Sequence, residues 1–179
     1  ANWNTEIGIL NFLPGGAHNV ANDKTKHLVR KWVPRVLRAT APRNSTNMDW
    51  IVFRVAELYL NYAEALNEYY ETPPKEAFDA VLKVRERSGM PGFPSTLNKE
   101  QFREKLRRER AVELAYEDHR FWDIRRWLIA DDEGVMKGAM YGLQLSAVTG
   151  APGKVHYKPY VFENRLWSDR SYLHPIKQT

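Results

Sequence analysis

Three glutamates spaced four residues apart are the first candidates for chemistry in this sequence. Phe102 and Leu106 define the inward face of an expected helix. Helical steps from these two residues lead to Glu109, Glu113 and Glu117. Acids on one core-facing stripe repel one another unless cations neutralise them. The stripe is therefore either a catalytic group or part of an ion-pair network.

Two interpretations of this acidic stripe compete. Two carboxylates could act together as in a glycoside hydrolase, with Glu113 and Glu117 as the pair. Alternatively, the stripe forms ion pairs that fix how two helical hairpins dock. We favour the ion pairs, because a general acid needs a carboxyl group in an apolar pocket, whereas arginine, which binds carboxylates through two hydrogen bonds, surrounds this stripe. The candidate partners are Arg110, Arg120, Arg125, Arg126 and either Arg85 or Arg87.

Aromatic and amide side chains in irregular segments are candidates for ligand binding. Sugars are held by aromatic faces together with polar groups that bind their hydroxyls. Asn2, Trp3 and Asn4 combine these types at the start of the chain, and Trp167 lies in an expected loop. We therefore predict that these four residues contact a ligand.

Composition and motifs exclude several classes of protein. The chain has 179 residues, a formal net charge of +5 and no cysteine, and 43% of its residues are hydrophobic. The charge is modest and the basic clusters contain acids, so we expect no nucleic-acid partner. The histidines lack metal-ligand spacing and no phosphate-binding glycine loop occurs, so we expect no metal site and no cofactor. No apolar run is long enough to span a membrane.

The apolar pattern predicts four helices. Apolar residues recur at helical spacing from Ile51 to about residue 71. Thr72 can cap a second helix with Pro73 at its first position, and Gly89 can end it in a left-handed conformation. Asn98 and Gln101 predict a capping box at the start of a third helix, which should reach about Tyr116. A fourth helix is expected from about residue 119 to 129.

Two helical hairpins in succession favour tetratricopeptide-like packing. The predicted fold class is all-α, with tetratricopeptide-like helical hairpins and long irregular N- and C-terminal segments. We expect an irregular segment at residues 1–48, which leads into the scaffold and carries possible ligand loops, and a helical core at residues 49–131. Residues 132–179 are expected to form a tail whose apolar side chains wrap over the helices.

Five ordered blocks resemble the C-terminal region of the SusD/RagB family. HLVRKWVP (27–34) is similar to the stretch before its first helix in this region, and RVAELYLNYAEALN (54–67) and AFDAVLKVRERSGMP (77–91) resemble two successive helices. FREKLRRERAVELAYEDHRFWDIRRW (102–127) resembles the most distinctive motif of the family, and YLHPI (172–176) resembles its closing segment.

The resemblance implies a non-enzymatic protein that captures glycans on the surface of the bacterial outer membrane. Its expected partners are an oligosaccharide or polysaccharide, a TonB-dependent transporter of the SusC type, and an N-terminal part of the same protein that carries the lipid anchor. The alternatives are a peptide-binding member of the family, a helical protein-binding adaptor, and a glycosidase.

Overall fold

The structure, a computed structural model, describes residues 23–26, 29, 31–32, 51–150 and 154–173. These residues fall into two compact units. The helical unit is Trp50–Asp123, and the ribbon unit combines the described residues of Ile124–Thr179 with those that precede Trp50. None of the helices in the described residues combines the length and the apolarity that a membrane crossing requires.

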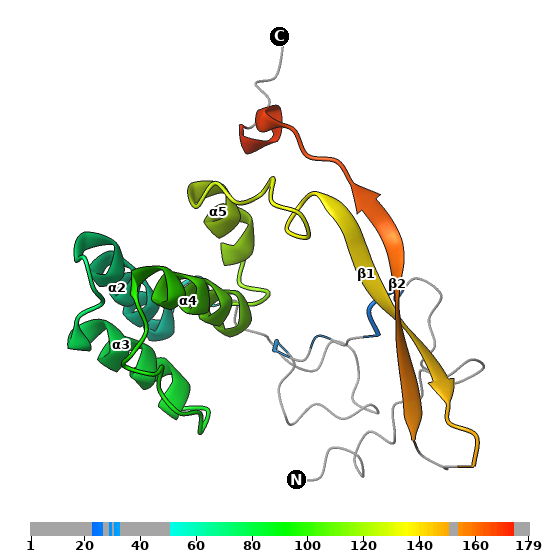
Figure 1. Ribbon diagram of the computed structural model, residues 1–179, viewed down its shortest axis with the longest axis horizontal. Helices are drawn as coiled ribbons and strands as arrows, with labels where there is room; N and C mark the ends of the chain where they lie inside the picture. Colours follow the sequence, from blue (N-terminus) through cyan, green and yellow to red (C-terminus); the bar gives the residue numbers. More distant parts are fainter. Residues whose placement is uncertain (1–22, 27–28, 30, 33–50, 151–153, 174–179) are drawn as a thin grey trace. The chain divides into compact units, whose positions relative to one another are not determined.

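Helices α2 (Val55–Tyr69) and α3 (Lys75–Glu86) form the first hairpin of the helical unit. They run in opposite directions and pack against each other, as the sequence predicts (Figure 1). Helix α2 begins at Val55 rather than at Ile51, because Arg54 at its N-cap has an extended backbone, with φ −149° and ψ 157°.

Helix α3 begins later than the sequence predicts. Pro74, not Thr72, occupies the N-cap position, and no side chain caps the helix. The prediction failed because the residue before a proline is disfavoured in the helical conformation, which excludes Pro73 as the first helical residue. The predicted end is confirmed, since Gly89 follows the helix with φ +70°.

Helices α4 (Lys99–Glu113) and α5 (His119–Arg126) follow. The predicted capping box is confirmed: Asn98 Oδ1 accepts from Gln101 N at 2.9 Å, and Asn98 N donates to Gln101 Oε1 at 3.2 Å. Helix α4 stops before Tyr116, which has a left-handed φ of +62°. The chain therefore turns sharply between α4 and α5.

The core of the helical unit lies among α2, α3 and α4. Phe102 and Leu106 are buried, as their spacing predicts. Phe78 and Phe93 pack edge-on against Phe102, with ring centroids 4.9 Å and 5.6 Å away. The other buried members of the cluster are Leu60, Ala63, Ala77, Ala80, Val81, Val84 and Leu114. Small residues where helices cross allow close packing.

The C-terminal part of the chain corrects the predicted fold class. Strands β1 (Gly138–Ala147) and β2 (Val155–Arg165) pair antiparallel in a two-stranded sheet (Figure 1). A bulge interrupts the register, because Met140 lies opposite Glu163 whereas Tyr141 lies opposite Val161. The fold is therefore helical with a β-ribbon, and it is neither purely all-α nor irregular throughout its tail.

The position of Pro159 explains how a proline fits in β2. Pro159 lies opposite Leu143, and the Leu143 amide donates to the Lys24 carbonyl at 2.9 Å. The amide of Leu143 therefore points away from β2, so this is a pair without mutual hydrogen bonds. Proline is tolerated at such a position because the ladder needs no N–H group there.

Candidate functional site

Arg54 joins two of the three glutamates of the stripe. Its Nη1 donates to Glu113 Oε1 at 2.5 Å and its Nε donates to Glu117 Oε2 at 2.7 Å. Its Nη2 also donates to the Glu113 carbonyl at 2.5 Å. Burial works to lower the pKa of Arg54, but the hydrogen bonds to Glu117 and Glu113 outweigh it and raise that pKa. Arg54 thus ties the start of α2 to the end of α4 and the turn beyond it.

Further contacts of the stripe come from the end of α3. Arg85 pairs with Glu109, and Arg87 Nη2 donates to Glu113 Oε1 at 2.9 Å. Arg85 also donates from Nε to the Pro91 carbonyl at 2.6 Å, and its guanidinium carbon lies 5.1 Å from the centroid of the Phe93 ring. The prediction that Arg85 or Arg87 pairs with the glutamates of the stripe is confirmed, and both do so.

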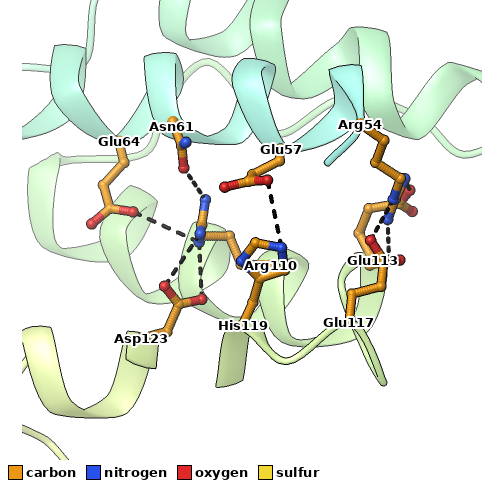
Figure 2. Close-up of polar contacts among 9 residues, drawn as sticks. All are labelled: Arg54, Glu57, Asn61, Glu64, Arg110, Glu113, Glu117, His119 and Asp123. Atoms are coloured by element: carbon orange, nitrogen blue, oxygen red, sulfur yellow. Dashed lines mark hydrogen bonds and ion pairs between the residues drawn. The ribbon is translucent and has the colours of Figure 1, made fainter. Parts of the chain in front are cut away.

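Arg110 pairs with a different carboxylate from the one expected. It is buried on α4 and donates from Nε and Nη2 to Asp123 of α5 at 3.1 Å and 3.2 Å. Its Nη1 donates to Asn61 Oδ1 of α2 at 2.6 Å (Figure 2). Neighbouring residues on a helix point in different directions, so Arg110 cannot follow Glu109 onto the stripe. It crosslinks α2, α4 and α5 instead.

Further polar pairs extend this network along α2. His119 Nε2 lies 3.5 Å from Glu57 Oε2, and Arg110 Nε lies 3.9 Å from Glu64 Oε2 (Figure 2). At the other end of α2, Arg103 donates to both carboxylate oxygens of Glu68 at 2.6 Å. These hydrogen bonds lower the pKa of Glu68, and burial opposes them.

The geometry of the stripe favours a structural role. Glu109, Glu113 and Glu117 have side chains exposed by only 15%, 12% and 4%, and each lies in an arginine ion pair. An acid catalyst needs a carboxyl group in apolar surroundings, and a hydrolase needs two carboxylates open to the substrate. The three glutamates meet neither requirement and instead hold α2, α3 and α4 together.

Trp167, a predicted ligand contact, is packed in the ribbon unit. The guanidinium carbon of Arg125 lies 5.2 Å from its ring centroid, and the ring of Tyr172 meets it edge-on at 5.3 Å. Its Nε1 is buried and has no hydrogen-bond partner among the residues described. Arg125 also donates to the Ser171 carbonyl at 3.3 Å. One face of the Trp167 ring is thus occupied by a cation.

Tyr172 anchors this segment to the residues after α5. Its hydroxyl accepts from the amides of Ala130 at 3.1 Å and Asp131 at 3.3 Å, and donates to Asp131 Oδ1 at 2.5 Å. That hydrogen bond lowers the pKa of Asp131. Burial is the largest cause that raises the pKa of Tyr172, and the same hydrogen bond raises it further.

The other predicted ligand contacts, Asn2, Trp3 and Asn4, lie outside the described residues. Within the described residues, no group of three or more potential metal ligands occurs.

Two tyrosines that the sequence analysis missed lie exposed on the ribbon. Tyr141 and Tyr157 are 64% and 61% exposed. The register places them on one face, because Tyr141, Leu143 and Leu145 alternate along β1 and Tyr157 lies opposite Leu145. Four residues separate Tyr141 from Leu145, the residue opposite Tyr157, so the two positions lie about 13 Å apart along the strand. In the sequence, Leu143 and Leu145 alternate with Gln144 and Ser146, and this alternation could have predicted the strand.

Comparison with known proteins identifies the family. The model of the SusD family matches residues 4–179. The chain therefore belongs to the SusD family, as the sequence blocks indicate.

Similar proteins cover only parts of this chain. SusD-like protein P25 of Formosa agariphila is 40% identical over 95 residues, which are 51% of this chain and 18% of that protein. SusD-like protein P38 of the same organism is 34% identical over 84 residues, which are 42% of this chain and 16% of that protein. A crystal structure of a SusD homolog from Bacteroides thetaiotaomicron is 38% identical, with a TM-score of 0.43, over 47% of this chain and 19% of that one.

Proposed function

We propose that this chain is part of a protein that captures glycans at the bacterial cell surface without catalysis. In this proposal, the protein delivers them to a TonB-dependent transporter of the SusC type. The observation that carries the proposal is membership of the SusD family over residues 4–179. Location on the extracellular face of the outer membrane, through a lipid anchor outside these residues, belongs to the same proposal.

The ion pairs of the acidic stripe support a non-catalytic role. Glu113 accepts hydrogen bonds from Arg54 and Arg87, so its carboxylate serves helix packing. Incubation of the protein with candidate polysaccharides should release no reducing sugar. Release that is abolished by Glu113→Gln would show a glycosidase and overturn the proposal.

Weak contacts spread over several aromatic side chains suit a protein that must pass its ligand on. Trp3, with Asn2 and Asn4, is the primary proposed contact, and Trp167 could contribute the ring face that Arg125 does not cover. Tyr141 and Tyr157 add two exposed aromatic rings on one face of the ribbon. Each such ring contributes about 1 kcal/mol to sugar binding, or roughly a fivefold change in Kd.

Calorimetry with a panel of oligosaccharides tests the proposal. We expect binding to at least one oligosaccharide, and Trp3→Ala should weaken it about fivefold or more. The double variant Tyr141→Ala/Tyr157→Ala tests the ribbon separately. Tyr70→Ala is the control, because Tyr70 is an exposed aromatic residue on the helical unit.

A peptide library in the same calorimeter provides the competing outcome. Binding of peptides and no oligosaccharide would replace the glycan assignment with a peptide-binding member of the family. Binding of neither ligand by the complete protein would contradict capture itself.

A further inference from the structure

One face of the ribbon carries a row of basic side chains. Successive side chains of a strand point to opposite faces, so Lys154, His156 and Lys158 share one face. Lys154 immediately precedes β2, and the Val148 amide donates to its carbonyl at 3.2 Å, which continues the strand register by one pair. All three basic side chains are exposed.

Neutral polar side chains lie beside this row. Gln144 of β1 lies opposite Lys158, and Ser146 lies opposite His156. Both are exposed. Amide and hydroxyl groups donate and accept hydrogen bonds, as the hydroxyls of a sugar require. The three basic residues together with Gln144 and Ser146 are named here the cationic face.

No carboxylate of the ribbon neutralises the cationic face. Strand β1 contains no charged residue, and the single acid of β2, Glu163, pairs with Arg165 at 3.2 Å near the other end of the strand. Within the part of the chain that the structure describes, the side chains of Lys154, His156 and Lys158 form no ion pair and no hydrogen bond. The arginines around the acidic stripe, in contrast, are bound by its glutamates. The cationic face therefore keeps its attraction for an anion that comes from outside the chain.

The spacing of the cations suits a polymer that repeats its charge. Successive members of the row are two residues apart on one strand, so their Cα atoms lie about 7 Å apart and the row is about 13 Å long. A chain with negative groups at intervals can contact several cations at once. The contacts after the first are then intramolecular, so weak single ion pairs add up to useful affinity.

We infer that the cationic face binds the negatively charged substituents of an anionic polysaccharide, which are either sulfate esters or uronate carboxylates. The inference rests on the proposed function and adds the charge of the captured glycan to it. The face lies on the side of the ribbon opposite to Tyr141 and Tyr157. Lysine suits it, because a compact ammonium group on a flexible stem accepts anions in many geometries.

Calorimetry on the complete protein tests the inference with two pairs of ligands. Oligogalacturonate is compared with its methyl ester, and carrageenan oligosaccharides are compared with their desulfated form. Each pair shares one backbone and differs in charge, so the two pairs separate carboxylates from sulfate esters. We expect the charged member of at least one pair to bind about tenfold more tightly than its neutral counterpart, and added salt should reduce that difference.

Variants of the two lysines assign the effect to the cationic face. Lys154→Gln/Lys158→Gln should weaken binding of the charged oligosaccharide about fivefold or more. Lys83→Gln/Lys105→Gln is the matched control, because it removes the same net charge from exposed positions of α3 and α4. This control should keep the Kd within about twofold. Circular dichroism checks that both variants are folded.

His156 provides a second readout, because a histidine gains its charge as the pH falls from about 8 to about 5, whereas lysine stays charged. The charged groups on its face are Lys154 and Lys158, and β1 contributes none. Binding of the charged oligosaccharide should tighten about twofold or more between about pH 7.5 and about pH 5.5, where carboxylates stay ionised. His156→Gln should remove this dependence on pH.

Several outcomes would overturn the inference. Equal or tighter binding of the neutral members, or charged binding that ignores the two lysines, would exclude the cationic face and leave glycan capture intact. Binding to vesicles of phosphatidylcholine and phosphatidylglycerol that needs both lysines, without binding of a charged oligosaccharide, would assign the face to a lipid surface. Binding of no oligosaccharide, charged or neutral, would contradict the proposed function and the inference together.

Discussion

At the scale of single residues, Arg110 is the most consequential polar side chain described. It is 3% exposed, and it shares two hydrogen bonds with Asp123, which is 4% exposed. A buried ion pair gains little over apolar replacements, but an orphaned buried charge is costly. The importance of Arg110 therefore lies in what its loss would leave behind.

We expect Arg110→Met to destabilise the protein by about 3–5 kcal/mol, because the variant removes from the buried Asp123 the ion pair and both hydrogen bonds that Arg110 supplies. Urea unfolding followed by circular dichroism measures the change. The double variant Arg110→Met/Asp123→Leu should recover much of the loss, since neither position then carries a charge. If the double variant loses as much unfolding free energy as the two single variants lose together, this account is wrong.

The ion pair between Glu68 and Arg103 makes stability depend on pH. Hydrogen bonds from Arg103 lower the pKa of Glu68 in the folded protein, so the unfolded chain binds a proton at higher pH than the folded chain does. The stabilisation is complete above the ordinary pKa of glutamate and is lost as the pH falls through the lowered pKa. It amounts to less than about 1 kcal/mol, because the Glu68 side chain is 43% exposed.

Unfolding of the protein and of Arg103→Gln should therefore be compared at about pH 6 and about pH 3. The unaltered protein should lose more stability on acidification than the variant does, by up to about 1 kcal/mol. Arg108→Gln is the control, because Arg108 pairs with Glu104 at an exposed position of α4. An equal acid response in all three proteins would argue against the contribution of Glu68.

Sequence reasoning identifies the acidic stripe but only part of its partners. Glu109 and Glu113 lie four residues apart, and α3 ends in arginines. These two features are sufficient to predict that Arg85 or Arg87 pairs with the stripe. Arg54 was missed because it lies 59 residues from Glu113 along the chain. Which of several arginines reaches a carboxylate depends on how the helices pack, and periodicity alone does not specify that arrangement.

At the scale of elements, local signals predict the helices well. The capping box of Asn98 and Gln101 and the left-handed Gly89 both depend on residues close in sequence, and both are confirmed. The ribbon was missed because Gly138, Gly142 and Pro159 interrupt the alternation of its strands and resemble loop signals. Whether these residues fit in a sheet depends on the bulge, on the neighbouring Lys24 segment and on the strand register. These features arise only when the strands pair.

Gly89 ends α3 in a way that can be tested. The Met90 amide donates to the Arg85 carbonyl at 3.0 Å, and the Gly89 amide donates to the Glu86 carbonyl at 2.9 Å. This pattern is a Schellman motif, which needs a left-handed residue at Gly89. A side chain there would have open space, because no heavy atom lies within 4 Å of the position that a Cβ atom would occupy.

Gly89→Ala should therefore destabilise the protein by about 1 kcal/mol through backbone strain alone. Gly89→Asn should cost less, because asparagine tolerates the left-handed conformation better than alanine does. Thermal unfolding of the three proteins checks the order. Equal stability of the alanine variant and the original protein would exclude a strained conformation at this position.

At the scale of the whole molecule, the ribbon joins residues that are far apart in the sequence. The Leu143 amide donates to the Lys24 carbonyl at 2.9 Å, so a segment near the start of the chain lies along the edge of β1. Gly142 permits this approach, because a Cβ atom there would clash with the Lys24 carbonyl oxygen. The contact covers one strand edge that would otherwise be open to pairing with another chain.

Gly142→Ala should displace the Lys24 segment from the ribbon, because the clash is with backbone and no side-chain rotation relieves it. The Leu143 amide would lose its acceptor, and its hydrogen exchange should accelerate at least tenfold, which corresponds to a loss of about 1.4 kcal/mol or more of local protection. Exchange measured by nuclear magnetic resonance gives this rate for each amide. Gly92→Ala is the matched control, since its Cβ would make an ordinary 3.4 Å contact with Leu82. Unchanged exchange at Leu143 in Gly142→Ala would show that the edge of β1 does not depend on Lys24.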